Sequence, residues 1–168
     1  MHCKTLKKII LFISIILLVL TTFSIYVRAD DSSSLYLDKL KFDVTVNEDG
    51  SMDVVETWNI DISHVNTLYK TFKMDDEKFT SIKNVKVKDI TANREFTQID
   101  EEMYHVTENC YYGLINSKGN FEIAWGVGLD DRYATRTYEI SYTVVDAIGK
   151  YNDYAELYWQ FIGEDFEV

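Results

Sequence analysis

Apolar and polar residues alternate on both sides of a short polar segment early in the chain. Apolar side chains take every second position over residues 40–46, and the alternation continues over 52–58. Such a period of two places one set of side chains on the buried face of a β-strand. The intervening residues 47–50 end in Gly50, which can supply the positive φ angle of a tight loop. The pattern therefore predicts a β-hairpin.

Shorter stretches of the same kind follow along the rest of the chain. They predict further strands at 67–73, 82–89, 110–115, 121–125, 137–145 and 157–161. The rest of 62–80 is predicted to be a polar link, and 126–136 a loop. Residues 91–110 stay undecided between loop and strand, and 146–155 have room for one helical turn. No segment has the period of an amphipathic helix.

About eight short strands separated by turns are typical of an all-β fold. We predict an antiparallel two-sheet sandwich of immunoglobulin-like kind, preceded by an N-terminal signal or transmembrane helix. In the last strand, Leu157, Trp159 and Phe161 alternate and are expected to point into the core. The cysteine pair that often joins the two sheets is absent, because Cys110 is the only cysteine after residue 29. We expect its thiol to be a small buried group, with an intermolecular disulfide as the alternative.

The first 29 residues have the plan of an export signal. Three lysines precede an apolar run at 9–20, and residues 27–29 have the small side chains of a cleavage site. The alternative is an uncleaved membrane anchor, because 9–27 approaches the length that crosses a bilayer. Under both interpretations residues 30–168 form one extracytoplasmic domain.

The net charge of residues 30–168 limits the classes of molecule that the domain is expected to bind. Residues 30–168 hold 13 Lys and Arg against 28 Asp and Glu, a formal net charge of −15, because four basic residues lie in the first 29. Phosphate binding requires a clustered basic face, so we expect no nucleic-acid partner. The acidity suits a solvated surface outside the cytoplasm, and binding of cations from the wall or medium is the alternative.

No catalytic, cofactor-binding or metal-binding residue is predicted. His64 and His105 stand 41 positions apart and outside any recognisable motif, so neither predicts a hydrolase. With Cys110 they are the only zinc-ligand candidates of the His or Cys type after residue 29, and a zinc site needs three or four ligands. The residues at 43–50 faintly resemble a calcium loop, but their spacing does not fit one and no glutamate stands at the end where such a loop requires it, so we expect a hairpin turn.

Two carboxylates and a group of aromatic residues have both a structural and a functional interpretation. Glu56 and Glu156 each lie in a patterned strand, where we expect a solvent-facing position; a buried carboxylate with a raised pKa is the alternative. Exposed rings near turns could stack on sugars or anchor a protein interface, although tyrosines also fill the faces of a sandwich. The candidates are Tyr111, Tyr112, Trp125 and Tyr133.

Three segments together carry a family resemblance. They read Phe42-Asp-Val-Thr-Val-Asn-Glu-Asp-Gly-Ser-Met-Asp-Val-Val-Glu-Thr-Trp58, Tyr138-Glu-Ile-Ser-Tyr-Thr-Val144 and Asp153-Tyr-Ala-Glu-Leu-Tyr-Trp-Gln-Phe-Ile-Gly163. In this order, and after a signal, they resemble the bacterial membrane proteins known as the domain of unknown function 2207. The resemblance covers most of residues 30–168.

The resemblance implies a signal peptide, an extracytoplasmic β-rich domain, transmembrane helices and often a glycine-rich tail. Two positions depart from it: Lys70 stands where arginine is usual, and Phe166 where tryptophan is usual. The last motif normally runs into a further strand before the membrane, so we expect the domain to be truncated at its C-terminal end. The family has no established activity, and no catalytic residue carries over.

The sequence therefore predicts a non-enzymatic extracytoplasmic domain of a membrane protein of unknown function. We expect it to act as an interaction module at the cell envelope, without a cofactor. Its expected partners are the membrane, through the N-terminal segment or missing C-terminal helices, and an envelope protein or glycan. The alternative is a carbohydrate- or cell-wall-binding module that uses surface aromatic residues.

Overall fold

The computed structural model describes residues 33–74 and 78–162. The predicted signal or anchor at 1–29 and Phe166 lie outside these residues. Within them, no helix is long and apolar enough to cross a membrane.

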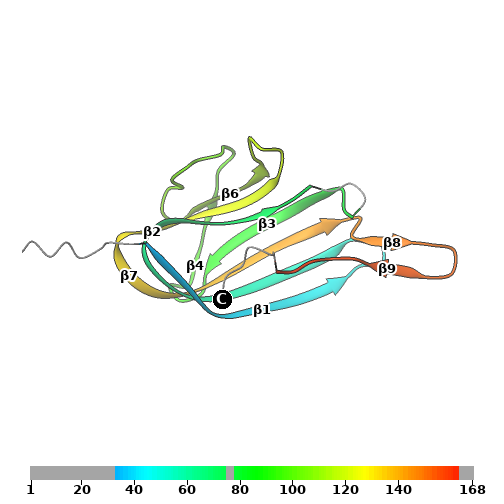
Figure 1. The fold of residues 1–168 in the computed structure, drawn as a ribbon, viewed down its shortest axis with the longest axis horizontal. Coiled ribbons are helices and arrows are strands. Elements are labelled where there is room, and N and C mark those ends of the chain that lie inside the picture. Colours follow the sequence, from blue (N-terminus) through cyan, green and yellow to red (C-terminus); the bar gives the residue numbers. More distant parts are fainter. Residues whose placement is uncertain (1–32, 75–77, 163–168) are drawn as a thin grey trace, which may run out of the picture. The chain divides into compact units, whose positions relative to one another are not determined.

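All regular secondary structure in the described part is β-strand (Figure 1). The strands are β1 (Ser34–Val46), β2 (Met52–Phe72), β3 (Ser81–Asp89), β4 (Arg94–Glu95), β5 (Thr97–Gln98), β6 (Cys110–Ile115), β7 (Phe121–Val145), β8 (Ile148–Lys150) and β9 (Ala155–Leu157). Seven of them form one sheet in the order β1-β2-β7-β3-β4, with β6 paired to β7 and β5 to β6. β8 and β9 form a separate hairpin.

The long strands β2 and β7 run antiparallel over their whole length, from the pair Met52 and Val144 to the pair Phe72 and Phe121. Their pairing is irregular between Ser63 and Thr67. On the two sides of this irregular region, β2 and β7 pair with different strands. The first half-sheet comprises β1, residues 52–62 of β2, residues 134–145 of β7, and β3. The second half-sheet comprises residues 67–72 of β2, residues 121–126 of β7, and β6.

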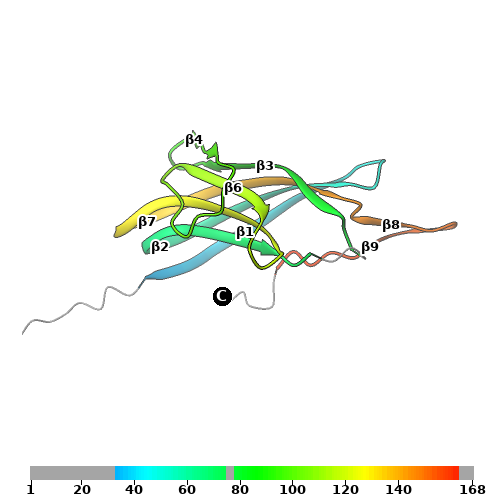
Figure 2. The same ribbon diagram turned by 90° about the horizontal axis from the view of Figure 1, so that it is seen from above.

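The two half-sheets pack against each other through their inner faces. Trp58 of the first half-sheet meets Trp125 of the second edge to face, with ring centroids 5.6 Å apart. Tyr138 contacts Trp125 at 5.9 Å. The Tyr111 hydroxyl of β6 donates to the Val85 carbonyl of β3 at 2.7 Å, so the two outer strands also meet. Figure 2 shows β3 and β6 on the same side of the β2–β7 pair.

The antiparallel all-β class is confirmed, with β5–β6 as a parallel exception among the strand pairs. The immunoglobulin-like sandwich of two sheets is not confirmed, because the main strands of the described part belong to one continuous sheet. The loop predicted at 126–136 is wrong, since β7 passes through it, and the link predicted at 62–66 is part of β2. Register shifts between Ser63 and Thr67 interrupt the period of two in this region. The alternation of apolar and polar residues therefore ends there, although β2 and β7 continue through it.

The hairpin between β1 and β2 is confirmed. Gly50 has a φ of 92°, and its amide donates to the Asn47 carbonyl at 3.0 Å. The Ser51 amide donates to the Asp49 carboxylate at 2.8 Å, and this bond lowers the pKa of Asp49. The β8–β9 hairpin contacts the same turn, because the Ile148 amide donates to the Gly50 carbonyl at 3.1 Å.

The strand predicted at 157–161 is wrong, because β9 ends at Leu157, which is exposed. Trp159 and Phe161 are half-buried and pack on the core without strand pairing. The Trp159 ring lies 5.2 Å from the Phe79 ring, and Phe161 lies 5.1 Å from Phe42. The helical turn predicted at 146–155 is also wrong, since β8 and the start of β9 occupy it.

Candidate functional site

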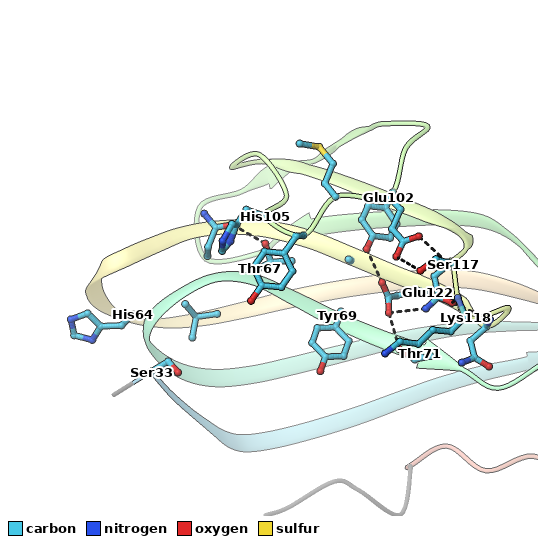
Figure 3. A pocket seen from close by; sticks show the side chains of 18 residues that line it. Ser33, His64, Thr67, Tyr69, Thr71, Glu102, His105, Ser117, Lys118 and Glu122 are labelled. Carbon is cyan, nitrogen blue, oxygen red and sulfur yellow. Dashed lines mark hydrogen bonds between the residues drawn. The ribbon is translucent and has the colours of Figure 1, made fainter. Parts of the chain in front are cut away.

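An open groove of about 770 Å³ lies on the outer face of the second half-sheet (Figure 3). In this part of β2, Leu68 and Phe72 face the core, so Tyr69 and Thr71 face outward. Glu122 of β7 lies beside them. The opposite wall comes from the loop at 99–109 and the turn at 116–120. We call this feature the outer groove.

The loop at 99–109 is held on the sheet by a small cluster of its own. Val106 is fully buried with Tyr112 and Ala124. Its amide donates to the Thr67 hydroxyl at 2.9 Å. Gly126 allows the backbone of the loop to lie directly against β7, because a Cβ at that position would stand 2.2 Å from the Thr107 carbonyl oxygen. The absence of a side chain at Gly126 therefore sets the position of the loop.

Two carboxylates of the outer groove are engaged in hydrogen bonds. Glu122 accepts from the Tyr112 hydroxyl at 2.7 Å, the Thr71 hydroxyl at 3.1 Å and the Asn116 amide group at 3.2 Å. Burial raises the pKa of Tyr112, and the hydrogen bond to Glu122 adds to this effect. Glu102 accepts from the Ser117 amide at 2.8 Å. Both carboxylates thus stabilise the turn at 116–120.

Exposed aromatic rings line the outer groove, although they are not the ones that the sequence indicated. Tyr69 is 65% exposed and Tyr104 is 90% exposed. The Tyr104 ring centroid lies 4.5 Å from that of His105. The alternation of 67–73 is enough to predict the outward position of Tyr69, whereas nothing in the sequence indicated that Tyr104 lines the same groove.

Of the four aromatic candidates from the sequence, only Tyr112 lines the outer groove, and its side chain is buried. Tyr111, Tyr112 and Trp125 are buried, which confirms the structural interpretation of these three residues and excludes them as surface rings. They occupy inward or covered positions because the loop at 99–109 and the first half-sheet pack on both faces of β6 and β7. Tyr133 is 66% exposed but does not line the outer groove.

Both histidines that the sequence singled out line the outer groove. His64 lies at the irregular part of β2 with a φ of 54°, and its Nδ1 is 2.7 Å from the Ser63 hydroxyl. His105 lies on the loop. Cys110 is half-buried against the Val106 cluster. Among residues 33–74 and 78–162, no three His, Cys, Asp or Glu side chains lie close enough to hold a metal ion.

Glu56 is fully buried, so the expected solvent-facing position is wrong. Its Oε1 accepts from Lys70 Nζ and from the Tyr142 hydroxyl, and its Oε2 accepts from Trp58 Nε1 at 2.8 Å. Burial lowers the pKa of Lys70, and the nearby negative charge of Glu56 opposes that effect. Burial also raises the pKa of Tyr142. Glu156 is exposed on β9, as expected.

A smaller pocket of about 360 Å³ lies where Trp159 and Phe161 cover the core. Phe72 and Phe79 also line it. Lys70 reaches this pocket, and its Nζ lies 5.2 Å from the centroid of the Phe72 ring. Because Lys70 already pairs with Glu56, its charge is neutralised inside the domain rather than offered to a ligand.

Comparison with known protein families assigns most of the chain. A family model described as "Predicted membrane protein (DUF2207) N-terminal domain" matches residues 36–168. No curated protein and no solved structure matches the chain.

Proposed function

The chain belongs to the family of predicted membrane protein N-terminal domains (DUF2207), and from this we propose that it is an extracytoplasmic, non-enzymatic interaction module of the cell envelope. Its binding face is the outer groove. The export signal expected at 1–29 and the acidic composition of residues 30–168 support the extracytoplasmic location.

The observation that carries the proposal is the combination of exposed rings and fixed walls in the outer groove. Tyr69 and Tyr104 offer large contact area with few rotatable bonds. The turn at 116–120 and the loop at 99–109 are held by hydrogen bonds and by the buried Val106. A groove with such fixed walls loses little conformational entropy when a partner binds.

The bonding of the acidic groups favours binding over catalysis. Glu122 receives three hydrogen bonds and Glu102 receives two from Ser117. A general base must be within reach of a substrate proton, whereas these oxygens are already used by the protein. The domain therefore acts by contact with a partner.

A glycan is the second candidate partner. Tyrosine rings stack on the apolar faces of sugar rings, and Asn and Ser side chains around them bind hydroxyl groups. The outer groove presents both kinds of group, through Tyr69 and Tyr104 on one hand and Ser117 and Asn120 on the other. Under this alternative the module binds the cell wall.

A pair of tyrosine substitutions tests both candidates. We expect Tyr69→Ala with Tyr104→Ala to weaken partner binding at least about tenfold, because exposed aromatic anchors dominate such surfaces. The matched control is Tyr133→Ala, since Tyr133 is as exposed as Tyr69 but lies outside the outer groove. Binding of the full chain to purified wall polysaccharide is measured by co-sedimentation.

A second measurement covers a protein partner. A photo-crosslinking amino acid at position 104 of the full chain should capture one defined envelope protein in living cells, and the same group at position 133 should not. An impermeant thiol reagent should label Tyr104→Cys in intact cells if the domain is extracytoplasmic. If neither glycan nor protein binding depends on the outer groove, the proposed function is wrong.

A further inference from the structure

Strand β1 is a free edge of the main sheet. It pairs with β2 on one side, and no other described strand pairs with it. Figure 1 shows it along the border of the sheet. A free edge presents backbone donors and acceptors on which another strand can pair.

The inner face of β1 is incompletely covered. Val44 and Val46 are 38% and 54% exposed, whereas their partners on β2, Val54 and Met52, are buried. Cross-strand partners share one face of a sheet, so these valines point toward the core side, and no described strand pairs beyond them at this edge. Leu35 is likewise exposed opposite a buried residue of β2. The edge therefore has a stripe of apolar side chains along it.

The regular part of β1 has defined ends. The pairing with β2 is irregular between Leu37 and Lys39, and it ends at Val46 before the turn. Phe42 lies at the middle of this regular part. An added strand can follow β1 without interruption only over this stretch.

We propose that β1 pairs antiparallel with β1 of a second copy of this chain, in a register centred on Phe42. On the inner face, Phe42 then lies opposite Phe42 of the second copy, and Leu40 lies opposite Val44. On the outer face, Lys41 lies opposite Asp43. The arrangement has two-fold symmetry, so the Lys–Asp pair is formed twice.

The exposed charges select this register. The side chains of Lys41 and Asp43 are both more than half exposed, and Lys41 Nζ lies 2.6 Å from Asp43 Oδ2. Both side chains are therefore free to contact a strand added at this edge. A shift by two residues in one direction would place Lys41 opposite Lys41, and in the other Asp43 opposite Asp43. Like charges directly opposite each other destabilise a strand pair. A shift by one residue would set apolar against polar side chains.

A charge exchange between copies tests the proposal on the full chain in detergent micelles. Lys41→Asp and Asp43→Lys should each weaken self-association at least about tenfold, because each creates two like-charge pairs in the symmetric dimer. An equimolar mixture of the two variants should associate again, since every Lys–Asp pair is then restored between unlike chains. Sedimentation equilibrium of differently labelled chains measures all three.

The control is Lys83→Asp, which changes an exposed charge on β3 and should leave self-association unchanged. Because the side chains of Lys41 and Asp43 are exposed, unchanged circular dichroism and thermal midpoints are expected for all variants. A wild-type chain that stays monomeric overturns the proposal. So does a mixture that fails to associate, or single variants that associate like the wild type. Binding in the outer groove lies on another half-sheet and is independent of these outcomes.

Discussion

Glu56 shows how one buried side chain organises its surroundings. Its two carboxylate oxygens accept hydrogen bonds from Lys70, Tyr142 and Trp58, which come from two strands. The Lys70 ammonium also lies over aromatic rings of Phe42 and Phe72. A charged group with such partners is tolerated in a core. Removing any one of these groups, however, leaves another buried polar group without its hydrogen bond.

We expect Glu56→Ala to destabilise the domain by about 3 to 5 kcal/mol, because it leaves the buried Lys70 without a counter-charge. The double variant Glu56→Leu with Lys70→Met should be less destabilised than Glu56→Ala, since both charges are then removed together. Glu156→Ala is the exposed control and should change stability by less than about 0.5 kcal/mol. Urea unfolding followed by tryptophan fluorescence measures these differences. Equal stabilities for the Glu56→Ala and Glu156→Ala variants would contradict a buried ion pair.

At the scale of elements, the loop at 99–109 depends on one glycine of β7. Because a methyl group at Gly126 would overlap the Thr107 carbonyl, the loop can keep its place only with glycine there. The loop in turn forms one wall of the outer groove. A change on the sheet therefore alters the outer groove.

We expect Gly126→Ala to displace the loop and to reduce partner binding as much as the tyrosine pair does. Hydrogen exchange at the amides of Val106 and Asn109 should accelerate by an order of magnitude or more, because their bonds to Thr67 and to Gly126 are lost. The control Gly149→Ala places the added methyl group on β8, where the nearest atom belongs to the Tyr151 side chain at 3.3 Å, and should leave both amides protected. Unchanged exchange in the Gly126→Ala variant would show that the loop does not rest on this residue.

Most of the elements could be predicted from the sequence, because residues 40–46 of β1, the first part of β2 and the ends of β7 keep a period of two. β3 and β6 were predicted from short apolar runs, although β3 has a register shift between Lys83 and Lys86 and β6 buries two consecutive tyrosines. The irregular region of β2 and β7 could not be predicted, since register shifts at Ser63 and Val65 interrupt the period without ending the pairing. The burial of Glu56 follows from the face it shares with Val54 and Trp58, but the sequence does not show that Lys70 is the counter-charge. The outer groove combines residues from three distant segments, so no local pattern indicated it.

At the scale of the whole described domain, buried tyrosines make stability depend on alkaline pH. Burial raises the pKa of Tyr112, Tyr138 and Tyr142 above the ordinary value of 10.0. The folded state therefore keeps these protons at a pH where the unfolded chain releases them. Because the folded state then binds more protons, stability falls as pH rises above 10. Lys70 acts in the opposite direction, since its pKa is lowered by burial, but it is a single group.

We expect the thermal midpoint to fall steeply between about pH 10 and pH 12 and to change little between about pH 7 and pH 9. Tyr138→Phe should make the alkaline fall shallower, because it removes one of the protons involved. Midpoints from circular dichroism, with phenolate absorbance recorded in parallel, measure the effect. An alkaline fall as steep in the Tyr138→Phe variant as in the wild type would contradict this role of the buried Tyr138 hydroxyl.

The pairing of β2 with β7 also governs when the chain can fold during synthesis. Met52 pairs with Val144, and β1 and β3 depend on β2 and β7 for their own hydrogen bonds. Contacts between residues so distant in sequence form slowly, because a long loop must close before they stabilise anything. The core therefore cannot assemble until residues as far as Val145 have left the ribosome. Before that point β2 lacks the partner strand that pairs with it over its whole length, so the central pairing of the sheet is absent.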